Sequence, residues 1–367
     1  MRYKDSGVDI KKGDVLSEYL YDCAKQTWLY KDKLRKVIVP YDDFSGIRYI
    51  DISQLPPDSV MNINFDGIGT KVEIAEMFEN YWFLAHDLFA MVCDDAASIG
   101  AEPMLIGTIL DVDKLSDIRM DGWSKALGDG YVSAAKEANV AIVNGEVAEL
   151  GSRICGRSSS LNLNWGAACV WFARKSNLID RSKISEGDYL VGLQETGFRS
   201  NGFSLIRKIM NTNLNESVKN LRIFHLTLEP SRIYTRAIVE MTGGFYGTSK
   251  AKIHGIAHIT GGGLYGKVKR MLKTCGLSAE INEPFEPPAI MKQIQRIGKV
   301  NDKEAYRTWN MGHGIVIITP EPSKVMKIAL KHGHNFKIIG RIIKDDTFYI
   351  RNLGSFARTN FLEFRDA

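Results

Sequence analysis

The sequence contains no run of apolar residues long enough to cross a membrane. A membrane helix needs roughly 18 consecutive apolar residues, and no window approaches that length. The first seven residues, Met-Arg-Tyr-Lys-Asp-Ser-Gly, also contain no apolar signal core. From these two absences we expect a cytosolic protein with no membrane partner.

Cysteine is scarce and unpatterned. The sequence has five cysteines, an odd number, and none of them forms a Cys-x-x-Cys pair. Disulfide frameworks and zinc sites both depend on paired or closely spaced cysteines. We therefore expect reduced thiols that serve mainly as packing residues.

No charge of one sign dominates, and there is no low-complexity segment or short-period repeat. The formal charge is +5, and the basic residues are spread among acidic ones. Nucleic acid is therefore not an expected partner, whereas a small anionic substrate suits the charge balance. The length of 367 residues, with 44% hydrophobic and 25% charged residues, is typical of a soluble protein of two domains.

Short apolar runs alternate with helical patterns, which is typical of an α/β fold. The first half predicts strands at 60–65, 140–143 and 167–173 and helices at 72–78 and 83–99. The second half predicts strands at 188–193 and 314–319, and helices at 203–210 and after the glycines at 261–263. We expect an N-terminal domain at 1–173, a C-terminal domain at 174–345 and a tail at 346–367.

The segment Asp-Gly-Ile-Gly-Thr-Lys at 66–71 lies where a strand gives way to a helix. Its glycines, Gly67 and Gly69, let backbone N–H groups approach a phosphate, while Asp66 faces a metal ion and Lys71 neutralises phosphate charge. With Thr70, these are candidate cofactor-binding residues. The segment is not a Walker A loop, and a tight turn with a solvated lysine explains the hexapeptide about equally well.

Three aspartates lie on the helix predicted at 83–99. Asp87 and Asp94 are close to two turns apart and project to nearly the same side, with Asp95 beside them. The residues between them are apolar, so buried carboxylates here need a compensating cation, and Mg²⁺ prefers such oxygen ligands. We expect Asp87 and Asp95 to belong to the site and Asp94 to face solvent.

A further acidic group follows the strand predicted at 140–143. Asn144, Gly145 and Glu146 are expected to form a turn, from which Glu146 reaches a shared cleft. Taken alone, such a glutamate is usually solvated. Together, Asp66, Asp95 and Glu146 form the expected metal-binding set of a magnesium–triphosphate site outside the P-loop design.

His258 comes shortly before a glycine run, in Ala-His-Ile-Thr-Gly-Gly-Gly at 257–263. Three glycines before a helix permit an anion at the helix N-terminus, where the imidazole could act on it. A lone histidine is more often structural, and His254 is the example we expect of that case. We interpret His258 as the catalytic residue.

Taken in order, these segments resemble the phosphoribosylformylglycinamidine cyclo-ligase family. The opening motif Tyr-Lys-Asp-Ser-Gly-Val-Asp-Ile at 3–10 and the histidine–glycine run are the most specific parts of the resemblance. The matching segments extend over residues 3 to 345 and also include those at 66–71, 87–95, 100–103, 145–149, 200–207, 230–234 and 306–312.

The resemblance implies a homodimer of two-domain subunits, each of mixed α/β (α+β) class. The N-terminal domain pairs across the dimer into a β-barrel, the C-terminal domain is α/β, and ATP and Mg²⁺ bind in the cleft. The family's reaction phosphorylates the formyl oxygen of formylglycinamidine ribonucleotide, and a substrate nitrogen then closes the imidazole ring of a purine precursor. The implied substrate-binding residues are Arg199, Ser200, Asn201, Thr260, Gly261, Gly262 and Gly263.

The sequence departs from the family pattern in several places. Residues 39–48 stand where the family carries a glycine-rich loop. Arg199 replaces a histidine, so a proton-transfer role is lost there, although an arginine can still hold a phosphate. Asp94 replaces an asparagine, and Asn164 replaces an aspartate. These departures allow either a divergent lineage or an altered substrate.

Two other readings stay open. Related ATP-using enzymes, such as thiamine-monophosphate kinase or selenophosphate synthetase, share the acidic cleft but lack the opening motif and the triple-glycine segment. A catalytically silent, nucleotide-binding paralogue would explain the lost glycine loop and Arg199. Retention of Asp66, Asp95, Glu146 and His258 argues against it, because a silent protein has no physical need for uncompensated carboxylates.

Overall fold

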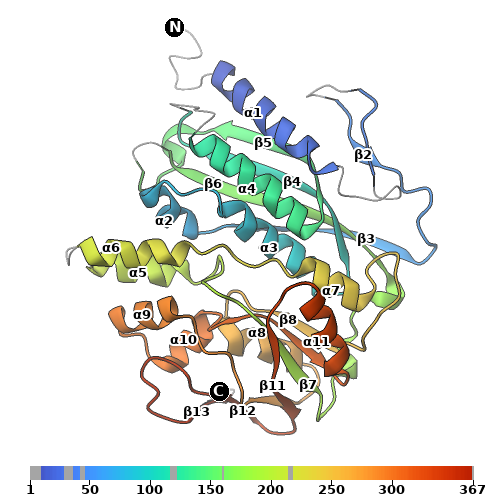
Figure 1. Cartoon of the computed structure of the whole chain (residues 1–367), viewed down its shortest axis with the longest axis vertical. Helices are drawn as coiled ribbons and strands as arrows, with labels where there is room; N and C mark the ends of the chain where they lie inside the picture. The colour runs from blue at the N-terminus through green and yellow to red at the C-terminus, as the bar shows by residue number, and fades with distance from the viewer. Residues whose placement is uncertain are drawn as a thin grey trace.

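The computed structural model consists of two halves, each built on its own sheet and stacked end to end (Figure 1). It describes residues 10–28, 36–41, 46–115, 122–158, 161–213 and 218–365. The opening motif therefore lies outside the described residues except for its last position, and so does the 42–45 part of the stretch that replaces the glycine-rich loop.

The first half is a four-stranded sheet with helices packed on one face. Its strand order is β3-β6-β4-β5, antiparallel except for the parallel pair β4–β5. Helix α3 packs on β3, β4 and β6, and α1 packs on β5. The elements are α1 (Ile10–Lys25), β3 (Ser59–Gly67), α2 (Lys71–Phe78), α3 (Leu84–Ala97), β4 (Glu102–Val112), α4 (Trp123–Ala138), β5 (Ala141–Glu149) and β6 (Leu163–Arg174), with a separate two-stranded ribbon of β1 (Val37–Ile38) and β2 (Tyr49–Ile50).

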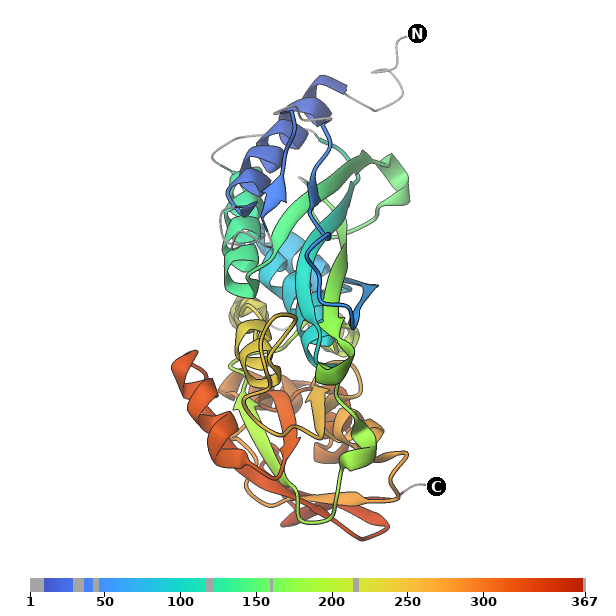
Figure 2. The ribbon, with the colours of Figure 1, turned by 90° about the vertical axis from the view of Figure 1, so that its right-hand side faces the viewer.

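The opposite face of this sheet exposes large apolar side chains. Phe65 on β3 is 71% exposed and Ile109 on β4 is 55% exposed, whereas Thr108, the neighbour of Ile109, is buried against the helices. This is the alternation of a strand with one covered and one open face. Figure 2 shows α1 and α4 on one side of the sheet only.

The second half is a seven-stranded sheet in the order β13-β12-β9-β11-β7-β10-β8, in which only β12 and β9 run parallel. Its strands are β7 (Tyr189–Gln194), β8 (Gly255–His258), β9 (Ser278–Ile281), β10 (His313–Thr319), β11 (Phe336–Ile343), β12 (Thr347–Arg351) and β13 (Phe361–Arg365). Its helices are α5 (Phe203–Asn213), α6 (Val218–His225), α7 (Thr235–Thr242), α8 (Gly263–Leu272), α9 (Ala289–Ile297), α10 (Asp302–Thr308) and α11 (Pro322–Lys331).

The prediction that residues 346–367 form a tail outside the second domain is wrong. Strands β12 and β13 pair with each other and join the sheet through β9. They do so because Phe348, Ile350, Leu362 and Phe364 alternate with polar residues and bury their side chains in the core.

Helices from both halves meet between the two sheets. Helix α2 contacts α5 and α6, while α3 and α4 contact α7. The expected cofactor and substrate segments flank this junction, because α2 follows β3, and α5 follows the loop at 197–202.

Two expectations from composition can be compared directly with the structure. All five cysteines are free thiols, as expected. Among the described residues, no helix combines the length and apolar character needed to cross a membrane.

Candidate functional site

Asp66 and Asp95 interact electrostatically with each other and with one cation, Lys267. Asp66, near the end of β3, is half-buried and accepts a hydrogen bond of 2.7 Å from the Gly67 N–H. Burial raises the pKa of Asp66, and the negative charge of Asp95 raises it further, whereas the Gly67 N–H and Lys267 oppose the rise. Because each carboxylate raises the cost of charging the other, a further cation bound beside them would be stabilised.

Lys267 was not predicted from the sequence as a residue of the site. It lies on α8, one helical turn beyond Gly263, so it projects along the same face as the start of the helix. Burial lowers the pKa of Lys267, while Asp95 and Asp66 counteract this shift. The four-residue spacing from the glycine run was the available signal.

His258 is held between Asp95 and Arg199. Its Nδ1 lies 2.6 Å from Asp95 Oδ1, and its Nε2 lies 2.6 Å from Nη2 of Arg199. The residue is 4% exposed, and burial together with the Arg199 charge lowers the pKa of His258 to about 4. Both ring nitrogens have partners inside the protein, and the catalytic role of His258 stays a prediction.

Arg199 is the centre of a buried ionic network. Its Nη1 donates to Glu195 Oε2 at 2.8 Å and to the Arg232 carbonyl at 3.0 Å, and its Nη2 donates to Asp94 Oδ2 at 3.2 Å. Arg199 is only 2% exposed. The expectation that it holds a substrate phosphate is not supported, because Nη1 and Nη2 already donate to buried partners within the protein and the side chain is closed to solvent; Nε has no hydrogen-bond partner but is also buried.

Asp94 is fully buried, so the prediction that it faces solvent is also wrong. Besides Arg199, it accepts hydrogen bonds from the Tyr234 N–H at 2.9 Å and the Thr235 hydroxyl at 2.8 Å. Burial raises the pKa of Asp94 to about 7, against the lowering effect of Arg199 and these donors. Asp94 and Arg199 are two departures from the family pattern, and here they are partners in one ion pair.

Lys71 and Asp87 form a second buried ion pair. Lys71 Nζ lies 2.7 Å from Asp87 Oδ2, and both side chains are 0% exposed. The ammonium also donates to the Phe198 and Glu229 carbonyls, while Asp87 Oδ1 accepts from the Ser231 N–H. Asp87 is thus compensated by Lys71 and not by Mg²⁺, and Lys71 does not face a phosphate, so both predictions are wrong.

The remainder of the 66–71 turn is accessible and approaches the second half. Gly69 is exposed with φ of +69°, a left-handed conformation that favours glycine. Thr70 Oγ1 lies 3.3 Å from Ser204 Oγ, at the start of α5. The turn therefore presents backbone toward the junction between the two halves.

The glycine run lies beside the loop at 197–202. A Cβ on Gly261 would lie 3.5 Å from Asn201 Nδ2, and Gly262, with φ of +95°, caps the N-terminus of α8. Gly263 must lack a side chain, because a Cβ there would come within 2.4 Å of the Tyr306 carbonyl. Ser200 and Thr260 are buried, whereas Gly261 and Gly262 are exposed, so solvent reaches the backbone of these two glycines.

Glu146 lies apart from the aspartate pair. Asn144, Gly145 and Glu146 do not form the expected turn, because β5 continues through them in parallel pairing with β4. Glu146 pairs with Ile109 on the open face, whereas Asp66 belongs to the register of Thr108 on the covered face. Within the described ranges, no group of three or more His, Cys, Asp or Glu residues is placed to hold a metal, so the three-carboxylate set is wrong.

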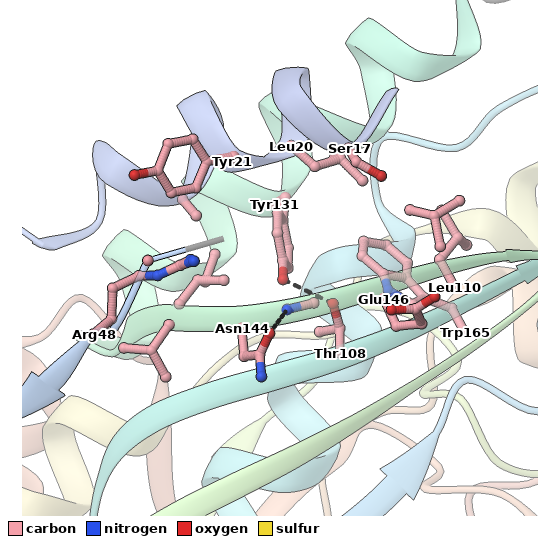
Figure 3. A pocket seen from close by; sticks show the side chains of 16 residues that line it. Ser17, Leu20, Tyr21, Arg48, Thr108, Leu110, Tyr131, Asn144, Glu146 and Trp165 are labelled. Atoms are coloured by element: carbon pink, nitrogen blue, oxygen red, sulfur yellow. Dashed lines mark hydrogen bonds between the residues drawn. The ribbon is translucent and has the colours of Figure 1, made fainter. Parts of the chain in front are cut away.

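Cavities lie on both faces of the sheet at 144–146. One of about 570 Å³ is on the open face, and its lining includes Asp66, Gly67, Ile109 and Glu146. The other, of about 440 Å³, lies between α1 and the sheet, and Figure 3 shows Tyr131 pointing at Thr108 across a 2.8 Å hydrogen bond. Either space is large enough for part of a nucleotide.

Comparison with known proteins decides the family. The family models described as "AIR synthase related protein" match residues 47–170 for the N-terminal domain and 185–351 for the C-terminal domain. A phosphoribosylformylglycinamidine cyclo-ligase of Thermoanaerobacter pseudethanolicus is 32% identical over 357 residues, which cover 94% of this chain and 98% of the relative. The chain belongs to the phosphoribosylformylglycinamidine cyclo-ligase family.

Solved structures share the fold of this cyclo-ligase family member. Escherichia coli HypE, a hydrogenase maturation protein, superposes with a TM-score of 0.61 at 16% identity, covering 96% of each chain. A HypE structure in complex with ATP gives a TM-score of 0.58 at 12% identity, covering 91% of this chain and 90% of the other. At these identities the likeness shows the fold alone, and it confirms the expected two-domain architecture; the barrel across a dimer stays a prediction.

Proposed function

We propose that the chain catalyses the ATP-dependent ring closure of formylglycinamidine ribonucleotide to aminoimidazole ribonucleotide, with ADP and phosphate as the other products. The reaction belongs to purine biosynthesis. Because its substrate and products are water-soluble nucleotides, we expect the protein to act in the cytoplasm. The observation that carries the proposal is the identity to a cyclo-ligase along nearly the full length of both chains.

We assign a triphosphate site and a substrate-phosphate site to the junction between the two halves. An amide-type oxygen is a poor leaving group until it carries a phosphoryl group, so the protein must align ATP with the substrate and spread charge. We assign the triphosphate to the turn at 66–70 and the substrate phosphate to the exposed glycines at the start of α8. The N-terminus of the ten-residue helix α8 carries the positive end of the helix dipole, which favours an anion there.

Mg²⁺ fits Asp66 and Asp95. Magnesium keeps several of its waters and is usually held by one or two carboxylates together with substrate phosphates. The charge of Asp95 raises the pKa of Asp66, and Lys267 is a cation that both carboxylates share. The ion would supply charge neutralisation of the triphosphate, while Asn144, Gly145 and Glu146 line the cavity between α1 and the sheet, which we assign to the rest of the nucleotide.

The alternative functions are less favoured. Likeness to the ATP-bound HypE structure supports ATP binding in a shared fold, but at 12% identity it does not favour kinase-like activity over ring closure. A silent paralogue was suggested by the Arg199 replacement. The charges of Arg199 and Asp94 compensate each other in a buried ion pair, so these two replacements leave no uncompensated charge that would indicate loss of function.

We also propose a homodimer formed through the open face of the N-terminal sheet. Phe65 and Ile109 project from this face, together with the exposed Met61 and Ile63. Contiguous exposed apolar side chains on a sheet mark an association surface. A second copy placed on this face would cover them symmetrically.

Product analysis tests the proposed reaction. The purified protein is incubated with formylglycinamidine ribonucleotide, ATP and Mg²⁺, and the nucleotide and imidazole products are quantified together. We expect one ADP per aminoimidazole ribonucleotide. ADP without imidazole would favour the related kinases, and absence of both products would favour the silent paralogue.

A further inference from the structure

The contact between Arg199 and His258 restricts what the histidine can do. A guanidinium group has five N–H donors, no acceptor, and does not lose its proton in proteins. Its Nη2 lies 2.6 Å from His258 Nε2, so that nitrogen must accept the hydrogen bond with its lone pair. The proton of the neutral ring is then on Nδ1, which faces Asp95 Oδ1 at 2.6 Å.

The chain Arg199–His258–Asp95 thus has one consistent arrangement of donors and acceptors. Arg199 donates to Nε2, and the Nδ1–H group donates to the carboxylate. Arg199 is itself fixed by three further acceptors, namely Glu195, Asp94 and the Arg232 carbonyl. The rigid end of the chain is therefore buried, while the Asp95 side chain at the other end is 44% exposed.

We propose that Arg199 is a positioning residue that anchors the ring of His258 by donating to its Nε2, and that His258 in turn orients Asp95 toward the Mg²⁺ of the bound nucleotide. This inference rests on the proposed function, because it takes Asp95 as a magnesium ligand. Residues that hold a metal ligand by a hydrogen bond typically change metal affinity by about 10- to 100-fold when they are replaced.

The first test is spectroscopic and needs neither substrate nor metal. Nitrogen-15 NMR of histidine-labelled protein at pH 7.5 reports which ring nitrogen carries the proton. We expect His258, assigned by comparison with a His258→Asn sample, to be neutral and protonated on Nδ1. A ring protonated on Nε2, or on both nitrogens, would overturn the proposal.

The second test measures the magnesium-dependent part of ATP binding by calorimetry, at several Mg²⁺ concentrations and without Mg²⁺. His258→Leu removes the donor to Asp95 and should weaken the apparent Mg²⁺ affinity by about 10- to 100-fold. His258→Asn keeps an N–H near the Nδ1 position and should lose less. Equal losses in these two variants would contradict the positioning role.

A matched control comes from the segment before the same strand. His254 Nδ1 lies 2.8 Å from Asp188 Oδ2, so it is also a histidine–aspartate pair, but neither residue belongs to the proposed site. His254→Leu should leave magnesium-dependent binding unchanged. A loss equal to that of His258→Leu would show a general structural effect and would refute the proposal.

The role of Arg199 is tested with Asp94→Asn/Glu195→Gln/Arg199→Met, which removes both buried ion pairs of Arg199 together and leaves neither carboxylate without its cation. If Arg199 acts through His258, adding His258→Leu to this variant causes no further loss of Mg²⁺ affinity. Additive losses would refute that route. A wild-type protein that binds no ATP with Mg²⁺ would refute the proposed function, while the NMR result still decides the Arg199–His258 contact.

Discussion

Replacement of Lys71 by methionine separates a structural role of this lysine from a phosphate-binding role. The change leaves Asp87 buried without its cation, and it removes the donor to the Phe198 and Glu229 carbonyls. Removing one partner of a buried ion pair typically costs about 3–5 kcal/mol. Since whole domains are stable by only about 5–15 kcal/mol, this is a large fraction of the total.

Urea unfolding followed by tryptophan fluorescence measures this loss as a lower midpoint. The ATP affinity of the folded fraction should change little, because Lys71 is fully buried and paired. Lys267→Met is the matched control and should behave in the opposite way. That lysine is half-buried beside Asp66 and Asp95, so its loss should weaken ATP binding with a small effect on stability.

One result would refute this reasoning. If Lys71→Met kept the wild-type urea midpoint but bound ATP much more weakly, Lys71 would be a phosphate ligand and the buried pair with Asp87 would not exist in solution.

Three further predictions follow from the same geometry. Asp66→Asn and Asp95→Asn should each weaken magnesium-dependent ATP binding, because one oxygen ligand is neutralised; unchanged affinity in both variants at fixed magnesium would contradict the carboxylate pair. Phe65→Glu should convert the dimer to a monomer in light scattering, whereas Leu330→Glu, at a similarly exposed residue (68%) on α11, should not; a wild-type monomer at micromolar concentration would remove the dimer proposal. Burial lowers the pKa of His313 to about 4, so the folded state binds fewer protons than the unfolded state, and the stability present above about pH 6.5 falls as the pH drops toward 4. At pH 5 the loss from this group is about 2 kcal/mol, and His313→Gln should reduce the fall in Tm between pH 7 and pH 5; an undiminished fall in calorimetry would contradict the assignment.

Local patterns predicted the elements that carry the site. The alternation in β3, the apolar helix α3 and the glycine run before α8 all have strong periodic or turn signals, and the structure contains each of them within a few residues of the expected range. These signals suffice because strand and helix periodicity follow from which faces are buried. They correctly predicted that Asp66 lies near the end of a strand and that Asp95 lies on a buried helix.

Pairings between distant residues could not be predicted in this way. Lys71 has the spacing of a phosphate ligand, but its other acceptors, the Phe198 and Glu229 carbonyls, come from the second half of the chain. The ion pair of Asp94 and Arg199 joins residues 105 positions apart. No periodicity in a single sequence indicates such a contact, so Asp94 was expected in solvent.

Turn composition was misleading at Glu146. The dipeptide Asn144–Gly145 is typical of a turn, yet both residues lie inside β5, because pairing with Gly107 and Thr108 of β4 satisfies their backbone. This tertiary pairing sets the face on which Glu146 projects, and it separates Glu146 from Asp66.

The most direct test of ring closure follows the formyl oxygen of the substrate. Formylglycinamidine ribonucleotide labelled with ¹⁸O in its formyl group is incubated with the protein, ATP and Mg²⁺, and the inorganic phosphate is analysed by mass spectrometry. Phosphorylation of that oxygen followed by attack of the substrate nitrogen predicts one ¹⁸O in each phosphate and one aminoimidazole ribonucleotide per phosphate released. Unlabelled phosphate, or ADP formation without the imidazole product, would contradict the proposed reaction.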